Sequence, residues 1–173
     1  MTHEIRPIDR RRGTFPPVRI LHIITRLIRG GADENTLYTV AGLDKTRYLV
    51  DLAVGPGSEL DLVDGLSEVG VHVVPELVRE PNPLKDLVAL FKLAYRIRKG
   101  RYQIVHTHTA KAGFLGRVAA AMVGAPIVIH TVHGVTFHEH LSPVQRGFYL
   151  ALERIAARFT DQFVAVGEDV KDI

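Results

Sequence analysis

The stretch Val18-Arg19-Ile20-Leu21-His22-Ile23-Ile24 is an apolar run typical of a buried strand, and the pair Gly30-Gly31 follows it closely. A helix-like segment begins near Ala32, so the glycines lie in a strand-to-helix turn. Such a turn leaves backbone N–H groups unpaired beside the positive end of the helix dipole, and this arrangement suits a phosphate or another anion. The same glycines also suit a plain tight turn, so the pair alone leaves both interpretations open.

On either side of this turn the chain alternates between strand-like and helix-like segments. The expected strands are 18–24, 48–54, 71–74, 103–107, 126–131 and 162–166, and the expected helices are 33–42, 59–69, 83–100, 110–123 and 143–159. This alternation predicts an α/β fold, with a doubly wound, mainly parallel, Rossmann-like sheet and helices on both faces. Residues 1–17 are expected to be a flexible basic leader, and residues 18–173 to be one domain.

Composition excludes several classes of protein. The chain of 173 residues has no cysteine, which excludes disulfides and thiolate chemistry, and no apolar secretory segment follows its first residues. The net charge is only +3 and aromatic residues make up 7% of the chain, so a nucleic-acid partner is not expected. We therefore expect a cytoplasmic domain.

The expected helix at 83–100 is unusually basic. Its cations flank a row of apolar side chains: Lys85, Lys92, Arg96, Arg98, Lys99 and Arg101 lie around Leu84, Leu87, Val88, Phe91 and Tyr95. A solvated surface helix is the simpler interpretation. The alternative is peripheral attachment to anionic lipid headgroups, at the inner face of a membrane.

Polar groups follow four of the expected strands. Gly30 and Gly31 come after the first strand, 107–109 after the fourth, 133–134 after the fifth and 167–168 after the sixth. In a parallel sheet the ligand lies beyond the carboxyl ends of the strands, so these groups are expected to converge on one edge.

The common nucleotide and hydrolase motifs are missing. No Gly-x-Gly-x-x-Gly follows the first strand and no acid ends the second, which disfavours NAD. The chain also lacks the Gly-Lys-Ser/Thr of a P-loop and the Gly-x-Ser-x-Gly of a serine hydrolase.

Histidines gather in the second half of the chain: His106, His108, His130, His133, His138 and His140. His106 and His108 share one face of a strand, but no third ligand at a fixed spacing is evident, so no metal site is expected. His106 and His130 are expected to be packed strand residues. His108 and His133 are expected to project into the cleft as hydrogen-bonding groups, and the last two histidines to lie in a loop.

Three segments together resemble the amino-terminal half of a group 1 (family 4) glycosyltransferase. They are 29–35 (Arg-Gly-Gly-Ala-Asp-Glu-Asn), 106–113 (His-Thr-His-Thr-Ala-Lys-Ala-Gly) and 130–134 (His-Thr-Val-His-Gly). The resemblance runs from about Val18 to the last residue. It implies one half of a GT-B fold, in which two Rossmann-like domains face a cleft. It also implies transfer of a sugar from a nucleotide donor to an acceptor, with retention of configuration and usually without a metal.

The resemblance assigns roles only at matching positions. It implies that His133 is the catalytic histidine of the cleft, that the donor is held by Gly30, Gly31, Asn35 and Gly134, and that the acceptor side is shaped by His108, Thr109 and Lys111. The family usually has Glu where this chain has Asp33, a conservative difference. No cofactor is implied beyond the nucleotide-sugar donor, and the acceptor is expected to be a sugar or a lipid-linked sugar.

The resemblance implies a carboxyl-terminal domain that binds most of the donor, and we expect that domain to lie outside these 173 residues. The expectation is therefore an acceptor-side domain that is inactive alone, from an enzyme of cell-envelope or exopolysaccharide synthesis. The alternative is a stand-alone, non-catalytic subunit that pairs with a separate donor-binding chain.

Overall fold

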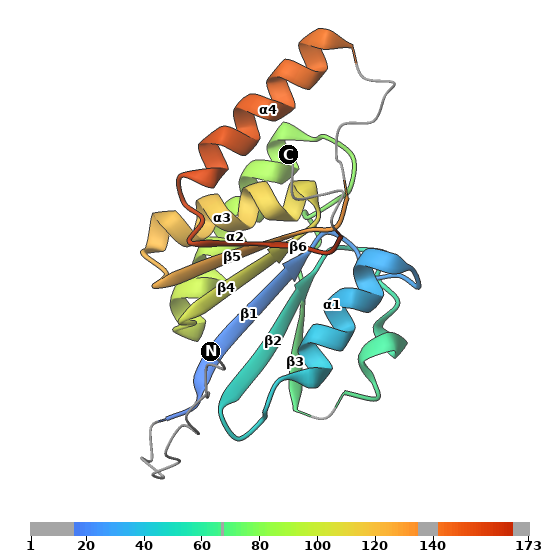
Figure 1. The fold of residues 1–173 in the computed structure, drawn as a ribbon, viewed down its shortest axis with the longest axis vertical. Coiled ribbons are helices and arrows are strands. Elements are labelled where there is room, and N and C mark those ends of the chain that lie inside the picture. Colours follow the sequence, from blue (N-terminus) through green and yellow to red (C-terminus); the bar gives the residue numbers. More distant parts are fainter. Residues whose placement is uncertain (1–15, 67, 135–141, 168–173) are drawn as a thin grey trace, which may run out of the picture.

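The computed structural model describes residues 16–66, 68–134 and 142–167, which form a six-stranded sheet with helices on both faces (Figure 1). The strands are β1 (Val18–Ile24), β2 (Tyr48–Val54), β3 (Val69–Val73), β4 (Ile104–His108), β5 (Ile127–Val132) and β6 (Gln162–Ala165). The helices are α1 (Gly31–Gly42), the short 3-10 helix Leu60–Val63, α2 (Pro83–Gly100), α3 (Ala110–Val123) and α4 (Pro143–Ala157). The predicted α/β class is confirmed.

All pairings in this sheet are parallel, and the strand order is β3-β2-β1-β4-β5-β6. The order reverses direction between β1 and β4, since β2 and β3 extend to one side of β1 and the later strands to the other. In folds of this type the ligand binds at such a switch point, outside the carboxyl ends of the two central strands. The turns after β1 and β4 lie at this point.

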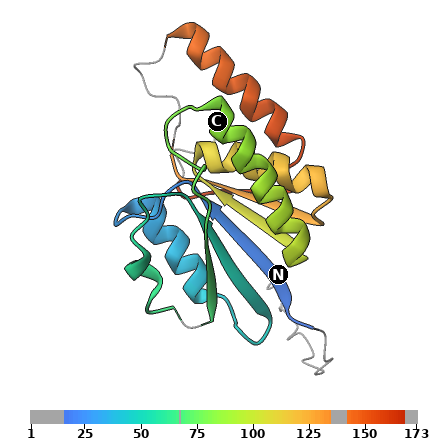
Figure 2. The ribbon, with the colours of Figure 1, turned by 180° about the vertical axis from the view of Figure 1, so that it is seen from behind.

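The two faces of the sheet have separate apolar cores. On one face, β1 contributes Leu21 and Ile23 to a cluster completed by α2 and α3. On the other face, Ile24 packs with residues of β2, with the 3-10 helix and with Leu37 of α1. Figures 1 and 2 show α1 on one side of the sheet and α2 and α3 on the other. This division follows from the alternation of side chains along each strand.

One predicted helix was wrong. Residues 59–69 were expected to be helical, but only Leu60–Val63 form a single 3-10 turn, and β3 already begins at Val69. Val69 pairs with Val50 of β2, so sheet pairing extends further toward the amino terminus than the predicted strand 71–74. Glu68 takes a positive φ of 64° just before this strand, a conformation that no helix contains.

The other predicted elements agree with the structure to within about two residues at most ends. Two helix starts follow directly from local chemistry: Asn82 caps α2 ahead of Pro83, and Ser142 forms a capping box with Gln145 ahead of Pro143. Among the described residues, no helix is long and apolar enough to cross a membrane. Most of the expected leader (residues 1–15), Glu168, His138 and His140 lie outside the described residues.

Candidate functional site

The glycine pair Gly30-Gly31, where the turn after β1 meets α1, is exposed to solvent and carries no side chains. Gly30 precedes the helix with φ 153°, and its carbonyl accepts the N–H groups of Asp33 and Glu34 at 3.1 and 2.9 Å. A Cβ atom built on Gly30 or on Gly31 meets no atom within 4 Å. The amino terminus of α1 therefore presents bare backbone to the carboxyl edge of the sheet, as an anion-binding turn requires.

Asp33 holds this turn in shape, a role that the sequence did not reveal. Its carboxylate accepts the N–H of Ile28 at 3.0 Å, which closes the loop between β1 and α1. The side chain is buried, and burial raises the pKa of Asp33 above its usual value. The sequence shows that Asp33 is an acid in the first turn of a helix. It does not show that the side chain folds back onto the loop, because an acid at such a position more often faces solvent.

Thr25, at the end of β1, joins this turn to the start of α3. Its Oγ1 lies 2.9 Å from Oγ1 of Thr109 and accepts the N–H of Ala112 at 3.2 Å. Thr109 precedes α3 and takes φ 60° and ψ 158°, a region that residues other than glycine rarely occupy. The two threonines thus tie the ends of β1 and β4 together at the switch point.

The other residues assigned to the acceptor and donor have defined surroundings. Lys111 pairs with Asp86 of α2 at 2.6 Å and donates to the carbonyl of Glu80 at 2.5 Å, so it ties α3 to α2. Asn35 lies half-buried in α1, where its backbone carbonyl accepts a hydrogen bond from the hydroxyl of Thr39. Gly134 is exposed, and a Cβ atom there meets nothing within 4 Å.

His108 does not project into the cleft as expected, because its side chain is completely buried. Its Nε2 lies 3.0 Å from Nδ1 of His22 in β1, and its Nδ1 lies 3.1 Å from Nε2 of His133. His133 follows β5 at the carboxyl edge and is half-buried. The interior of the sheet is thus connected to the edge by three imidazoles, a link that the sequence did not suggest because His22 lies so far away along the chain.

His22 also supplies the third imidazole that the sequence analysis did not find. Nitrogens of His22, His106 and His108 lie within 4.8 Å of one another. Nδ1 of His22 and Nε2 of His108 are at a hydrogen-bond distance of 3.0 Å, and the three rings are packed against one another with centroids 4.4–5.3 Å apart.

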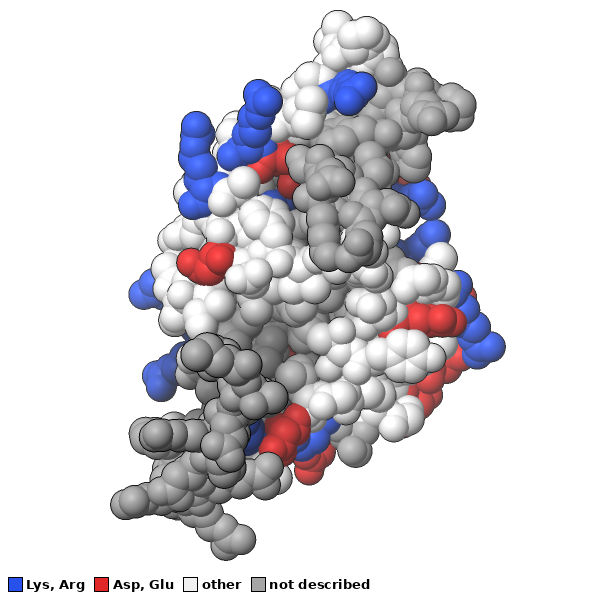
Figure 3. All heavy atoms as spheres, in the orientation of Figure 1, with Lys and Arg blue, Asp and Glu red and all other residues white. Residues whose placement is uncertain are grey.

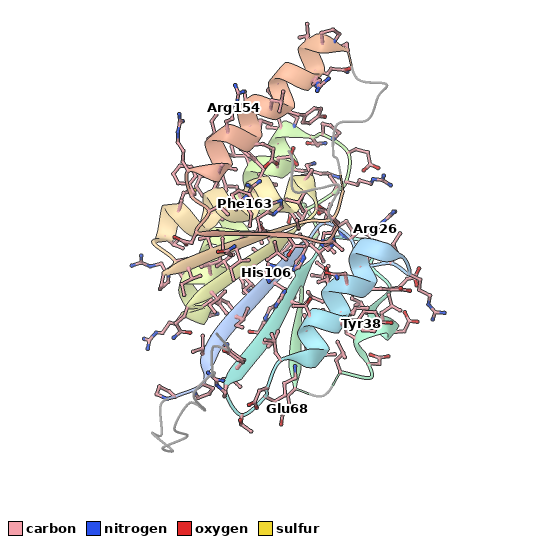
Figure 4. All side chains as sticks on the ribbon, viewed as in Figure 1. Arg26, Tyr38, Glu68, His106, Arg154 and Phe163 are labelled. Carbon is pink, nitrogen blue, oxygen red and sulfur yellow. The ribbon has the colours of Figure 1, made fainter. Side chains whose placement is uncertain are left out.

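His106 and His130 are buried strand residues, as predicted, and they face opposite sides of the sheet. His106 lies over the middle of the sheet in Figure 4, and its Nε2 bonds to Oγ1 of Thr131 at 2.7 Å. Nδ1 of His130 bonds to Oγ1 of Thr107 at 2.9 Å. Burial lowers the pKa of His106 to about 4 and the pKa of His130 to about 3.

The arrangement can bind an anionic or hydroxyl-bearing ligand at the carboxyl edge. Both α1 and α3 begin there. Burial lowers the pKa of His133, which is therefore neutral at physiological pH. Arg26 lies at the same end of the sheet, close to the start of α1, as Figure 4 shows. Figure 3 shows the molecule in the orientation of Figure 1. On the side that it shows, basic side chains lie around the outline with acidic ones among them, and the described residues form no concentrated basic patch.

Solved structures share this fold. A glycosyltransferase from Rickettsia africae ESF-5 superposes with a TM-score of 0.67 at 21% identity, covering 91% of this chain and 39% of that one. MurG of Acinetobacter baumannii superposes with a TM-score of 0.64 at 15% identity, covering 88% of this chain and 43% of that one. At such identities the likeness concerns the fold alone, which is the Rossmann-like, GT-B type that the resemblance implied.

Two curated relatives are similar in sequence. One is the UDP-Gal:alpha-D-GlcNAc-diphosphoundecaprenol alpha-1,3-galactosyltransferase of Escherichia coli, 31% identical over 163 residues, covering 94% of this chain and 42% of the relative. The other is the capsular polysaccharide biosynthesis glycosyltransferase CapM of Staphylococcus aureus, 30% identical over 161 residues, covering 88% of this chain and 38% of the relative. The chain spans about two fifths of the length of these relatives.

The family itself is shown by a match that spans most of the chain. Residues 30–173 match the Glycosyl transferase 4-like domain. This range begins at the glycine turn and includes α3 and the loop that carries His133. The chain therefore belongs to the Glycosyl transferase 4-like domain family, the amino-terminal domain of group 1 glycosyltransferases.

Proposed function

We propose that this chain is the acceptor-side domain of a retaining glycosyltransferase that moves a sugar from a nucleotide-sugar donor during cell-envelope or exopolysaccharide synthesis. The observation that carries the proposal is the exposed Gly30-Gly31 turn, which offers bare backbone beside the switch point of a family 4 domain. The names of the two curated relatives refer to a lipid-linked sugar and to capsular polysaccharide. By analogy, the proposed acceptor is a sugar carried on a lipid diphosphate.

In this proposal the backbone N–H groups of Gly30 and Gly31 face the donor diphosphate. Negative charge develops on that group as the sugar leaves, and donors held in place beforehand stabilise the charge without reorganising. His133 lies at the adjacent strand end and acts as the catalytic histidine beside the transferred sugar. Thr109 and Lys111 shape the acceptor side indirectly, because their side chains hold the start of α3 against β1 and α2.

A single Rossmann-like domain forms one wall of a two-domain cleft. We therefore expect the 173-residue chain to have no transferase activity alone, and to need a donor-binding domain on the same or another polypeptide. The alternative function is a non-catalytic subunit that binds the acceptor and pairs with a separate donor-binding chain.

The intact mass of the endogenous polypeptide separates these two readings. A mass near twice the 19.2 kDa of this chain supports the domain of a longer enzyme. A native product of 19.2 kDa supports the separate subunit. Sugar transfer from UDP-sugars to a lipid-diphosphate-linked sugar is then measured for that polypeptide and for the 173-residue chain. Turnover by the 173-residue chain alone would contradict the proposal that it holds only one side of the active site.

The variant Gly30→Ala tests the glycine turn in the active polypeptide. Alanine is strained at φ 153° and its methyl group occupies the open space of the turn, so we expect transfer to fall by about 10²-fold. Gly42→Ala is the matched control, since Gly42 lies at the far end of α1 and also has open space around it. Equal activity of both variants would rule out a role of the turn at the diphosphate.

We also propose that α2 attaches the domain to an anionic membrane surface, where a lipid-linked acceptor resides. Its row of apolar side chains is exposed rather than buried: Leu84 by 79%, Leu87 by 52%, Phe91 by 56% and Tyr95 by 64%. Lys85, Arg96 and Lys99 border this row, so the helix combines an apolar strip with positive charge. That combination suits a phospholipid interface.

Vesicle co-sedimentation tests this attachment. The protein is expected to bind vesicles containing phosphatidylglycerol and to bind neutral phosphatidylcholine vesicles much less. The double variant Leu87→Ser/Phe91→Ser should abolish binding, whereas Val144→Ser, at an 82% exposed apolar residue of α4, should not. Equal binding by the two variants would show that α2 is an ordinary solvated helix.

A further inference from the structure

A continuous chain of three imidazoles runs from the core of the sheet to its carboxyl edge. We call His22, His108 and His133 the histidine chain. They come from β1, from the last residue of β4 and from the turn after β5, and their nitrogens lie 3.0 and 3.1 Å apart at the two links. The middle ring uses both of its nitrogens in these links. His22 is 1% exposed and His108 is 0% exposed.

The three rings are neutral at physiological pH. Burial is the largest cause of the lowered pKa in each of them, and in His22 and His108 the pKa lies well below that of a free histidine. A neutral imidazole carries a single N–H and a single lone pair. Each link needs one donor and one acceptor, so the N–H groups of all three rings must point in the same direction along the histidine chain.

The two ends of the histidine chain decide which direction that is. Nε2 of His22 and Nδ1 of His133 are both buried atoms, and neither has a hydrogen-bond partner among the described residues. One of these two atoms must carry an unpaired N–H, which costs more than an unused lone pair. The whole His22 side chain is 1% exposed inside the sheet, whereas His133 is only half-buried and lies at the carboxyl edge. An acceptor oxygen from a substrate is therefore expected at the His133 end.

We propose that His22 and His108 are positioning residues that hold His133 as the tautomer protonated on Nδ1, with its N–H available to an oxygen of the bound sugar substrate. His22 donates from Nδ1 to Nε2 of His108, which donates from Nδ1 to Nε2 of His133. His133 therefore acts as a hydrogen-bond donor, since its only lone pair is already occupied. The oxygen acceptor rests on the proposed function, whereas the tautomer does not.

The tautomers can be read directly by NMR of the protein labelled with ¹⁵N-histidine, because protonated and unprotonated ring nitrogens differ in chemical shift. We expect His133 to be protonated on Nδ1. In His22→Leu the donor to His108 is lost, and we expect His133 to shift toward the Nε2-protonated form. In His22→Asn the side-chain amide replaces the Nδ1–H of His22 and should restore the wild-type signal. His72→Gln is the control, at a histidine of β3 outside the histidine chain.

The outcomes are distinct. A wild-type His133 protonated on Nε2 overturns the proposal, and this result needs no variant that might fold poorly. A Zn²⁺-dependent shift of all three rings in the His22, His106 and His108 cluster also overturns it, because the cluster would then be a metal site. In the active polypeptide, we expect His22→Leu to lower kcat by about tenfold or more and His22→Asn to recover most of that loss. The expected tautomer, together with no sugar transfer by the full endogenous polypeptide, would support the histidine chain and reject the proposed function.

Discussion

At the scale of single residues, close packing between helix and sheet occurs where α3 crosses β4 and β5. Gly113 lies in α3 directly opposite the ring of His130, and a Cβ atom on it would lie 2.5 Å from Cε1 of that ring. The ring is held by Thr107 and cannot move away without losing its hydrogen bond. Glycine is therefore needed at this position for close approach of a helix to a strand, not for an unusual backbone angle.

The variant Gly113→Ala should lower the free energy of unfolding by about 1–3 kcal/mol, because the added methyl group overpacks the contact with His130. Gly147→Ala is the matched control, also within a helix. A Cβ atom there meets nothing within 4 Å, so the free energy of unfolding should rise by about 0.5–1 kcal/mol. Urea unfolding measures both values, and a stabilised Gly113→Ala would contradict this packing.

At the scale of secondary structure, a buried ion pair joins α3 to α4. Arg117 of α3 is 0% exposed, yet it donates to Glu153 of α4 at 2.7 Å and to the carbonyl of Gly113 at 2.8 Å. One of its terminal nitrogens, Nη1, is buried with no partner among the described residues. A charge in such surroundings depends on its single carboxylate partner, so this contact sets where α4 docks.

Glu153→Ala should lower the free energy of unfolding by about 1–3 kcal/mol, since it leaves the Arg117 guanidinium buried without a counter-charge. Arg154→Ala, at the neighbouring exposed residue of α4, should change it by less than about 0.5 kcal/mol. The double variant Arg117→Met/Glu153→Ala removes both charges and should recover most of the loss. If the double variant is as unstable as Glu153→Ala, the loss of stability comes from the missing side-chain volume and not from the unpaired charge.

At the scale of the whole molecule, the sheet buries neutral histidines on both faces. His22, His106 and His108 lie on the face covered by α1, and His130 lies on the face covered by α3. Burial lowers the pKa of all four. The unfolded chain therefore binds more protons than the folded protein once the pH falls below about 6.5.

The free energy of unfolding should consequently be highest above about pH 6.5 and fall as the pH decreases from there toward 4. At pH 5 each fully shifted histidine accounts for about 2 kcal/mol, so the four together approach the whole stability of a typical domain. Urea unfolding between pH 7.5 and 5 measures this slope, in a range where most carboxylates remain ionised. His106→Gln should make the slope shallower, and a slope of zero in the wild-type protein would contradict the buried, neutral state.

Most of the fold could be predicted because each strand and helix carries its own signal. The apolar run 18–24 and the Pro83-to-Gly100 helix are local patterns, and their bounds in the structure agree with the prediction. The prediction for segment 59–69 was wrong. Its periodicity suits a helix, but pairing of Val69 with Val50 in the sheet takes precedence over that local preference. Such pairing depends on residues that are distant in the sequence.

For the candidate site, the sequence by itself determined which segments reach the carboxyl edge. Strand direction alone brings the Gly30-Gly31 turn, Thr109 and His133 to that edge once the sheet is parallel. Only the tertiary structure decided how these groups meet. The register of β1 against β4 sets His22 beside His106 and buries His108, which the sequence placed in the cleft. Contacts between strands far apart in the chain depend on register and on twist, and neither is written in any local stretch of sequence.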